Sequence, residues 1–209
     1  MKITKAQAQA NRVHVVKTAS TLFRERGYDG VGVADLMAAA GFTHGGFYKH
    51  FRSKADLMAE SAACGIAESA ALTAGVDMSE FVRLYISRAH RDTLATGCTM
   101  AALCGDAVRQ PEEVRTTFAA GIEMQLAALS QQDTSLNGVD AGRTRASSLD
   151  ILAHAIGAIV MSRACPDDSP LADEILSTCR DKILASLSET ASLSSTSIAS
   201  TPVSVRTTV

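Results

Sequence analysis

The pattern of apolar and polar residues predicts helices along nearly the whole chain. The first apolar run repeats every three or four residues and stops before Gly27, which is the spacing of one helix face. Its members are Val13, Val16, Ala19, Leu22 and Phe23. A second helix is expected over 33–40, where Leu36 and Met37 lie among small alanines. Small side chains allow two helices to cross closely, as a helix-turn-helix requires.

Capping signals divide the rest of the chain into further helices. Asp77 followed by Glu80, and Pro111 followed by two glutamates, are typical of helix starts. Together with a short helix after Thr43, these signals predict about nine helices and an all-α fold. The other expected helices cover 54–72, 77–95, 98–108, 111–130, 141–164 and 169–187.

The last two long helices carry more apolar surface than a thin bundle can hide. Helix 141–164 is apolar nearly all round, which implies burial on several sides. Its apolar run, 151–161, contains His154 and is too short to cross a bilayer. The last helix presents one apolar stripe, made of Leu171, Ile175, Cys179, Ile183 and Leu187. These faces either complete the core of one chain or pair with a second copy.

Both ends of the chain differ from its middle. Residues 189–209 are rich in Ser, Thr, Ala and Val, contain Pro202 and lack a helical period, which predicts a disordered tail. Residues 1–10 are polar, so no signal peptide is expected. Because no apolar stretch is long enough to span a bilayer, the expected location is the cytoplasm and no membrane partner is expected.

The segment 41–54 combines helix signals with cations. Gly41 is expected to end the second helix in a left-handed conformation, and Thr43 to cap the next helix through its hydroxyl. At about 100° per residue, Phe47 then points away from the arc that stays open. The residues on the open arc are His44, Gly45, Tyr48 and Lys49. One side can enter a core while the other meets a partner.

Gly45 and Gly46 have two interpretations. Each costs a helix roughly 0.5–1 kcal/mol relative to alanine. Either the bare backbone lets a helix approach base edges and phosphates closely, or the two glycines belong to a loop. Lys54 favours the first interpretation, because a lysine in a first turn opposes the helix dipole unless an external anion is its partner. Ser53 and Asp56 form the capping pattern that places Lys54 there.

The charges are divided unequally between the two parts of the chain. Residues 1–56 carry nine Lys and Arg against four Asp and Glu, whereas residues 57–209 carry eleven against eighteen. The near-neutral total charge of −2 is therefore the sum of a basic N-terminal part, 1–56, and an acidic remainder, 57–209. A basic face is often only a solvated surface, but its coincidence with the helix-turn-helix pattern favours salt-sensitive binding of DNA.

The order of residues over 13–57 is specific. After the first helix come Gly27-Tyr28, Gly30, Val33, Leu36, Ala40-Gly41-Phe42-Thr43, Gly45, Phe47-Tyr48, His50-Phe51, Ser53-Lys54 and Leu57. This order resembles the DNA-binding domain of the tetracycline-repressor (TetR) family of bacterial regulators. The resemblance implies a three-helix helix-turn-helix domain over 1–53, joined to a helical effector-binding and dimerisation domain over 54–188. Gly32 departs from the family pattern, which commonly has serine or threonine before the second helix.

The resemblance also implies which residues meet DNA, since the third helix of that family enters the major groove. The groove-facing set is then Thr43, His44, Gly45, Gly46, Tyr48 and Lys49, and the phosphate contacts are Tyr48, His50 and Lys54. Side chains that form bidentate hydrogen bonds to bases are missing between His44 and Lys49. Base reading must then rely on these few side chains, close backbone approach and DNA shape.

As a function, the resemblance implies a ligand-responsive transcriptional regulator, with repression as the expected mode. Such a protein binds a near-palindromic operator as a homodimer through its last two long helices and is released by a small, mainly apolar or electrophilic effector. Its partners are double-stranded DNA, a second copy and the effector. The candidate effector contacts, which apolar spacing alone would assign to the core, are Phe81, Tyr85, Met100, Leu103, Cys104, Phe118, Ile122 and Met124.

The five cysteines have neither zinc spacing nor the context of a disulfide framework, so no metal is expected. Cys98 follows Gly97 at an expected helix start, where the helix dipole favours a reactive thiolate. The competing interpretation is a small buried apolar residue. A thiol-based redox or electrophile-sensing helical protein using Cys98 is therefore the alternative function. The scattered histidines and the lack of catalytic motifs argue against an enzyme, and no cofactor is expected.

Overall fold

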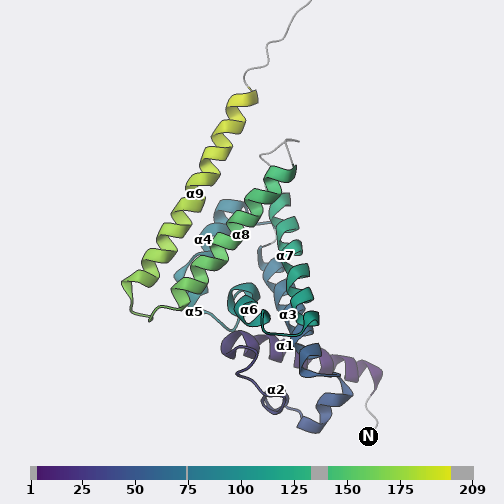
Figure 1. Cartoon of the computed structure of the whole chain (residues 1–209). Helices are drawn as coiled ribbons and strands as arrows, with labels where there is room; N and C mark the ends of the chain where they lie inside the picture. Colours follow the sequence, from purple (N-terminus) through teal and green to yellow (C-terminus); the bar gives the residue numbers. More distant parts are fainter. Residues whose placement is uncertain (1–3, 74, 133–140, 199–209) are drawn as a thin grey trace, which may run out of the picture.

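The computed structural model describes residues 4–73, 75–132 and 141–198, and within these ranges it consists of helices joined by turns and loops (Figure 1). The all-α prediction is confirmed. The helices are α1 (Lys5–Arg26), α2 (Val33–Ala39), the 3-10 helix η1 (His44–Lys49), α3 (Lys54–Thr73), α4 (Met78–Tyr85), α5 (Arg88–Asp92), α6 (Thr99–Ala107), α7 (Glu112–Gln132), α8 (Ala141–Arg163) and α9 (Pro170–Ile198).

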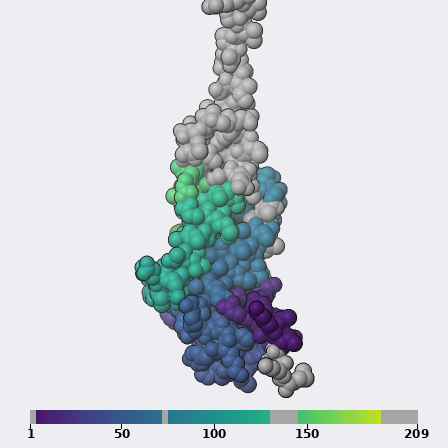
Figure 2. Space-filling model, turned by 90° about the vertical axis from the view of Figure 1, so that its right-hand side faces the viewer, coloured from purple at the N-terminus to yellow at the C-terminus, as the bar shows by residue number. Residues whose placement is uncertain are grey.

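The molecule is elongated, with its N-terminal helices at one end. α1, α2 and the segment before α3 form the lower end in Figure 1, and Figure 2 shows the same end in purple and blue. α3 packs against both α1 and α7, so it joins this end to the larger helical body. α8 packs on α7 and α9, which leaves α9 at the outer edge.

Local signals account for the ends of the N-terminal helices. The Thr4 hydroxyl accepts a hydrogen bond from the Gln7 N–H at 3.1 Å, so α1 begins earlier than its apolar pattern predicts. Gly41 leaves α2 at a φ of 77°, which confirms the predicted left-handed cap. At the start of α2, the Asp35 carboxylate accepts the Gly32 N–H at 3.1 Å and compensates for the side-chain cap that glycine lacks.

The predicted helix over 77–95 is two helices, α4 and α5. Ile86 turns out of the helical region with ψ at 71°, and its side chain is fully buried. The Ser87 hydroxyl then accepts the His90 N–H at 3.2 Å and caps a new short helix. The prediction of one continuous helix is wrong because serine inside a helical pattern also competes as a cap.

The prediction of a tail without structure from residue 189 is wrong for 189–198, because α9 continues to Ile198. No glycine or proline interrupts the sequence between Pro170 and Pro202, and serine and threonine cost a helix only a few tenths of a kcal/mol each. The same prediction for 199–209 lies outside the described residues.

Apolar side chains hold η1 against the N-terminal helices. Phe47 is 0% exposed and Phe51 is 2% exposed, and their ring centroids lie 5.4 Å apart. Leu36 and Met37 of α2 belong to the same buried core. The helix-turn-helix therefore has an apolar side that is fully covered, and this fixes which side of η1 faces outward.

Replacing Phe47 by alanine should lower the free energy of unfolding by about 3–5 kcal/mol, because it removes a fully buried aromatic ring. Urea denaturation followed by circular dichroism would measure this. The neighbouring Tyr48 is 67% exposed, so Tyr48→Ala should change stability by less than about 0.5 kcal/mol. Equal losses in the two variants would contradict the inward orientation of Phe47.

Candidate functional site

The open side of η1 carries the polar residues that the sequence places there. Thr43, His44, Gly45, Tyr48 and Lys49 are exposed, Gly46 is partly buried, and Phe47 is buried behind them. The predicted separation of Phe47 from the polar arc is confirmed. The whole set lies at one end of the molecule, on the side away from the α1 and α2 core.

Thr43 does not cap η1 through its hydroxyl, and this prediction is wrong. The turn is closed instead by the backbone, with the Gly46 N–H donating to the Thr43 carbonyl at 2.9 Å. That pattern is the tighter bonding of a 3-10 helix, which also differs from the expected α-helix. The exposed hydroxyl of Thr43 therefore remains outside the capping of its own helix.

Neither glycine in η1 is required by the packing of the free protein. A Cβ at Gly45 would meet nothing within 4 Å, and one at Gly46 would reach the Met37 side chain at an ordinary 3.5 Å. Neither residue has a positive φ. The reason for these two glycines therefore lies outside the internal structure of the chain.

Lys54 has an internal partner that sequence reasoning missed. Its ammonium donates a hydrogen bond to the Tyr28 carbonyl at 2.5 Å and lies 5.9 Å from the centre of the Phe23 ring. The Tyr28 carbonyl therefore compensates the lysine at this helix start, and the prediction that Lys54 needs an external anion is wrong. The carbonyl of His50, the other predicted phosphate contact, accepts a hydrogen bond from Arg12 at 3.2 Å.

One of the two hydrogen bonds of the predicted capping pattern at the start of α3 is confirmed, and the other goes to a different residue. The Ser53 hydroxyl accepts the Asp56 N–H at 3.0 Å, while the Asp56 carboxylate accepts the backbone N–H of Arg52 at 3.1 Å. The Arg52 guanidinium also pairs with this carboxylate, and these two bonds hold the pKa of Asp56 below its ordinary value. The Arg52 side chain is 85% exposed, so it remains accessible beside η1.

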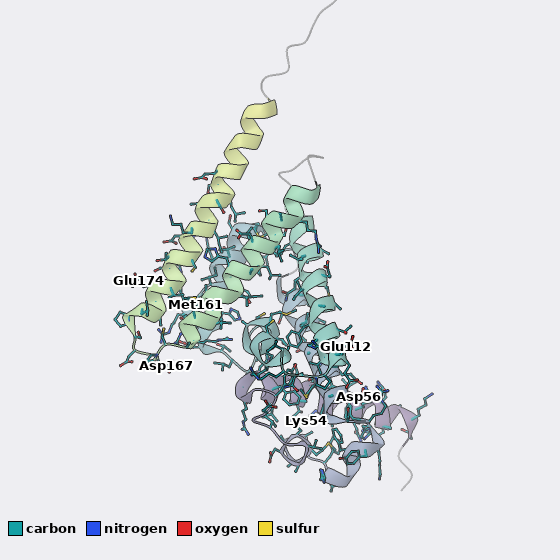
Figure 3. The ribbon with its side chains drawn as sticks, in the orientation of Figure 1. Lys54, Asp56, Glu112, Met161, Asp167 and Glu174 are labelled. Atoms are coloured by element: carbon teal, nitrogen blue, oxygen red, sulfur yellow. The ribbon has the colours of Figure 1, made fainter. Side chains whose placement is uncertain are left out.

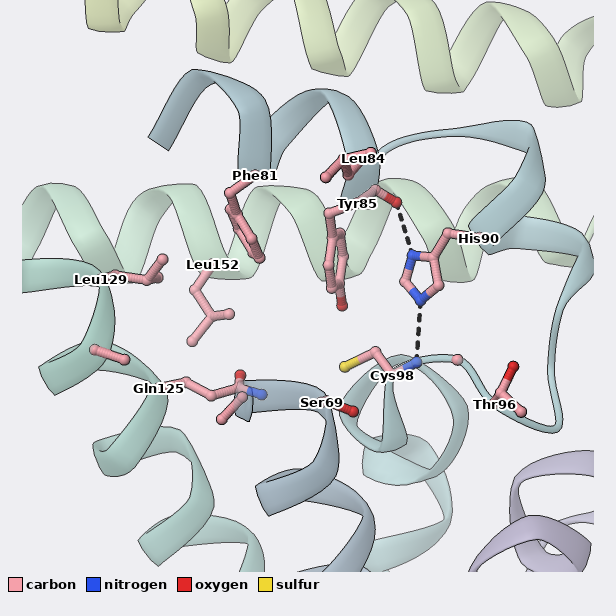
Figure 4. A pocket seen from close by; sticks show the side chains of 13 residues that line it. Ser69, Phe81, Leu84, Tyr85, His90, Thr96, Cys98, Gln125, Leu129 and Leu152 are labelled. Carbon is pink, nitrogen blue, oxygen red and sulfur yellow. Dashed lines mark hydrogen bonds between the residues drawn. The ribbon is translucent and has the colours of Figure 1, made fainter. Parts of the chain in front are cut away.

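A second candidate site is a cavity of about 250 Å³ in the helical body (Figure 4). It is enclosed by α3, α4, α5, α7, α8 and the loop that leads into α6. Its lining residues are Ser69, Ala70, Phe81, Leu84, Tyr85, His90, Thr96, Gly97, Cys98, Gln125, Ala128, Leu129 and Leu152.

Two of the predicted effector contacts line this cavity, and the others do not. Phe81 and Tyr85 are in its wall, and Cys98, predicted as a thiol sensor, joins them. The rest lie outside this wall and pack in or against the core: Met100, Leu103, Cys104, Phe118 and Ile122. Met124 lines a shallower groove between α3 and α7. Helical spacing does not distinguish a cavity wall from a packed core.

His90 is the polar residue of this wall that sequence reasoning missed. Its Nε2 accepts the backbone N–H of Cys98 at 3.0 Å, so its Nδ1 carries the proton and donates to the Tyr85 carbonyl at 2.7 Å (Figure 4). Burial lowers the pKa of His90. Both ring nitrogens are occupied, and the neutral imidazole ties the end of α4 to the start of α6.

Tyr85 and Gln125 each bring an unpaired polar atom to the cavity. The Tyr85 hydroxyl and the Gln125 Oε1 are buried and have no hydrogen-bond partner. Burial raises the pKa of Tyr85 well above its ordinary value, and the neighbouring Cys98 raises it further. A buried polar atom without a partner is uncommon, so these two atoms mark the polar part of a mainly apolar cavity.

Cys98 is buried at the start of α6, where the structure places it as the residue before the helix. The expected position at a helix start is confirmed. Cys104 lies six residues further along the chain, and burial raises its pKa to about 11. This disfavours a reactive thiolate at Cys104. Among the described residues no cluster of three His, Cys, Asp or Glu is arranged to hold a metal ion.

α6 links the cavity to α1. Arg24 of α1 donates to the Ala95 carbonyl at 2.7 Å, just before the cavity loop, and to the Thr99 hydroxyl at 3.3 Å, in the first turn of α6. At the other end of α6, the Asp106 carboxylate accepts the Tyr28 N–H at 3.1 Å. The helix that begins at Cys98 is therefore bound at both ends to the N-terminal domain.

Apolar residues remain exposed on α8 and α9. Leu149, Ala153 and Val160 lie within about 40° of one another around α8 at 100° per residue, and all three are exposed. Met161 is 59% exposed and Leu171 of α9 is 52% exposed. Figure 3 shows Met161 near the edge formed by these helices, far from Lys54 and Asp56. Burial of helix 141–164 on several sides is therefore not complete in one chain.

Comparison with known proteins agrees with this architecture. Residues 15–60 match the model of the bacterial regulatory proteins, tetR family. The HTH-type transcriptional regulator AcrR of Shigella flexneri is 39% identical over 57 residues, which are 27% of this chain and 26% of AcrR. The HTH-type transcriptional repressor DhaR of Mycobacterium sp. (strain GP1) is 49% identical over 43 residues, which are 21% of this chain and 22% of DhaR.

The match to the TetR family therefore covers residues 15–60 of this chain. The matched segment of this chain spans about a quarter of the length of AcrR and DhaR. Over 83% of this chain and 95% of NemR, the fold is like that of E. coli NemR in its reduced form, with a TM-score of 0.64 and 21% identity. None of the described helices is both long and apolar enough to cross a membrane.

The neutral His90 makes the stability of the helical body depend on pH. In the unfolded chain a histidine titrates at about pH 6.5, whereas burial lowers the pKa of folded His90. Between those two values the unfolded state binds more protons, so the stabilisation is complete above about pH 6.5 and is lost as the pH falls below it.

Wild-type unfolding free energy should therefore fall more steeply below about pH 6.5 than that of His90→Gln, by at most about 1.4 kcal/mol per pH unit. Urea titrations at a series of pH values would measure both slopes. His14→Gln, at an exposed histidine of α1, is the control and should keep the wild-type slope. A His90→Gln slope equal to that of wild type would contradict the buried neutral imidazole.

Proposed function

We propose that this protein is a homodimeric transcriptional regulator that binds double-stranded DNA through its TetR-family domain and responds to a small molecule in the cavity beside Cys98. Repression is the expected mode, in keeping with the repressor DhaR among its relatives. The effector lowers the affinity for a near-palindromic operator. The proposal places the protein in the cytoplasm and gives it no catalytic role.

The observation that carries the DNA-binding part is the two-sided character of η1. Phe47 locks one side into the core, so the opposite side, with His44, Tyr48 and Lys49, faces outward as a unit. Gly45 and Gly46 have no packing role of their own, and bare backbone at this position allows a major groove to come close. A free helix-turn-helix face of this kind supports insertion into DNA.

Charge supports the same assignment. The excess of Lys and Arg lies within residues 1–56, at the end of the molecule that carries η1. Lys49 and the exposed guanidinium of Arg52 flank the polar face. Tyr48, His50 and Lys54 are the proposed phosphate contacts, and Lys54 can serve only if its ammonium shares its protons between the Tyr28 carbonyl and a phosphate.

A gel-shift titration on DNA from beside the protein's own gene tests this proposal, and it should give a discrete complex that weakens as salt rises. Lys49→Gln should weaken binding to every sequence and lower the slope of log affinity against log salt by about one. Lys182→Gln removes an exposed lysine of α9 and should leave both quantities unchanged. Binding without preference over competitor DNA would refute the regulator.

The exposed apolar surface of α8 supports the dimer. Leu149, Ala153, Ile156 and Val160 follow one another at intervals of four, three and four residues, which is the spacing of a helix–helix seam. A two-fold pairing of α8 and α9 with their copies would cover this surface. It would also present two η1 segments to successive major-groove faces, about 34–36 Å apart.

Val160→Asp should raise the dimer dissociation constant at least tenfold, since an unpaired charge buried in the seam costs more than about 1.4 kcal/mol. Sedimentation velocity over a concentration series would detect the shift to monomer, and operator affinity should fall with it. Val108→Asp, at a valine that is 70% exposed on the far end of α6, is the matched control. A Val160→Asp protein that remains a dimer would show that the interface lies elsewhere.

The contacts of α6 suggest how the effector acts. A ligand that pushes on Cys98 or His90 displaces the start of α6, and the bonds from Arg24 to Thr99 and from Tyr28 to Asp106 carry this displacement to α1. Movement of α1 changes the separation of the two η1 segments in the dimer. Only a ligand with different affinities for the two arrangements can shift their equilibrium.

A thiol-based redox or electrophile-sensing role of Cys98 is the second candidate, and the position of its side chain in the cavity wall favours it. A covalent adduct on this sulfur would occupy the same space as a bound effector and displace the same helix. Both candidates therefore predict release of DNA. Covalent sensing requires the Cys98 thiol, whereas reversible binding of an effector does not.

A further inference from the structure

The cavity beside Cys98 has an apolar body and a small polar part. Phe81, Leu129 and Leu152 line one portion of it, while Tyr85 and Gln125 direct their side chains into it from α4 and α7 (Figure 4). The Tyr85 hydroxyl can donate one hydrogen bond, and the Gln125 Oε1 can only accept. Both atoms are buried and neither has a partner that meets hydrogen-bond geometry, although the Cys98 thiol lies near the Tyr85 hydroxyl. Leaving them so is costly unless a bound molecule pairs with them.

The wall contains no ionised side chain. Its residues include no Asp, Glu, Lys or Arg, and the one titratable imidazole, His90, is held neutral by bonds at both nitrogens. A charged group placed here would lose part of its hydration without gaining a counter-ion from the wall, which is unfavourable. The lining therefore selects against a carboxylate or an ammonium group.

Arg163 of α8 is a cation near this wall, since its Nη2 would lie 3.1 Å from a Cβ at Gly97. Its Nε and Nη2 donate to the carbonyls of Arg91 and His90, both at 2.9 Å, while its Nη1 is buried without a partner. Arg163 does not line the cavity, so it adds no ionised side chain to the wall. A charged ligand could be accommodated here if it were an anion that reached the unpaired Nη1 of Arg163.

We propose that the cavity takes a neutral hydroxylated aromatic molecule of one or two rings, such as a phenol, whose hydroxyl accepts from Tyr85 and donates to Gln125. This ligand class rests on the proposed function, since the cavity is its effector site. A hydroxyl group offers both the acceptor that the Tyr85 hydroxyl lacks and the donor that the Gln125 Oε1 lacks, whereas a ketone or an ether offers only the acceptor. Phe81, Leu129 and Leu152 pack against the rings, and a volume of about 250 Å³ limits their number.

Isothermal titration calorimetry on the full-length protein tests this with three compounds of the same ring system: β-naphthol, its methyl ether and β-naphthoate. β-Naphthol should bind at least tenfold more tightly than the other two, because only its hydroxyl pairs with both atoms without bringing a charge. Gln125→Leu removes the acceptor, so it should bring the affinities for β-naphthol and its methyl ether within about twofold of each other.

Tyr85→Phe should weaken both β-naphthol and its methyl ether about tenfold, since both accept the tyrosine proton. Each of these two substitutions removes an unpaired buried polar atom, so the melting temperature without ligand should be maintained or raised. Tyr48→Phe makes the same chemical change at an exposed tyrosine of η1 and should leave all affinities as in wild type.

Equal affinities for β-naphthol and its methyl ether in the wild type would overturn the proposal, as would tighter binding of β-naphthoate, which would assign the site to Arg163 and an anion. Unchanged affinities in Tyr85→Phe would mean that ordered water already pairs with the hydroxyl, and would overturn it too. A separate gel shift distinguishes the two proposals. Specific DNA binding without these ligand preferences would support the proposed regulator and contradict the ligand class. These ligand preferences without specific DNA binding would support the ligand class and contradict the regulator.

Discussion

The structure depends on a buried cation, Arg24 of α1, which binds α6 and the loop before it at the point where α3 also packs. Its guanidinium donates to the Ser20 hydroxyl at 2.8 Å within α1, to the Thr99 hydroxyl of α6 and to the Ala95 carbonyl. Burial lowers the pKa of Arg24, and such a charge is tolerated inside a protein only when its donors are paired. α6 is therefore held against the N-terminal domain by several bonds to one residue.

The third helix at this point is α3, and its approach requires a glycine. A Cβ at Gly65 would lie 2.4 Å from the Thr99 hydroxyl and 2.5 Å from the Arg24 guanidinium, distances at which atoms overlap. Glycine at this position lets α3 lie directly on the paired arginine. The convergence of α1, α3 and α6 makes the end that carries η1 and the cavity two parts of one packed body. It is the contact through which the proposed displacement at Cys98 would reach α1.

Much of the N-terminal domain could be predicted from the sequence, because its signals are local. Gly41 as a left-handed cap, Ser53 as the cap of α3 and Phe47 as the inward residue of η1 each depend on neighbours within a few positions. The errors came where a residue has a distant partner or a competing local bond. Lys54 bonds to the Tyr28 carbonyl across 26 positions, and Ser87 ends one helix by capping the next.

By itself, the sequence determined the helical class, the order of the elements, the basic N-terminal end and the polar face of η1, because helical period, caps and charge are properties of short segments. Only the tertiary structure decided which apolar residues enclose a cavity and which fill the core. Phe81 and Phe118 are both buried in the core, yet only Phe81 also lines the cavity. The wall is assembled from several helices, so its polar atoms, Tyr85 Oη and Gln125 Oε1, become neighbours of one space only after those helices pack.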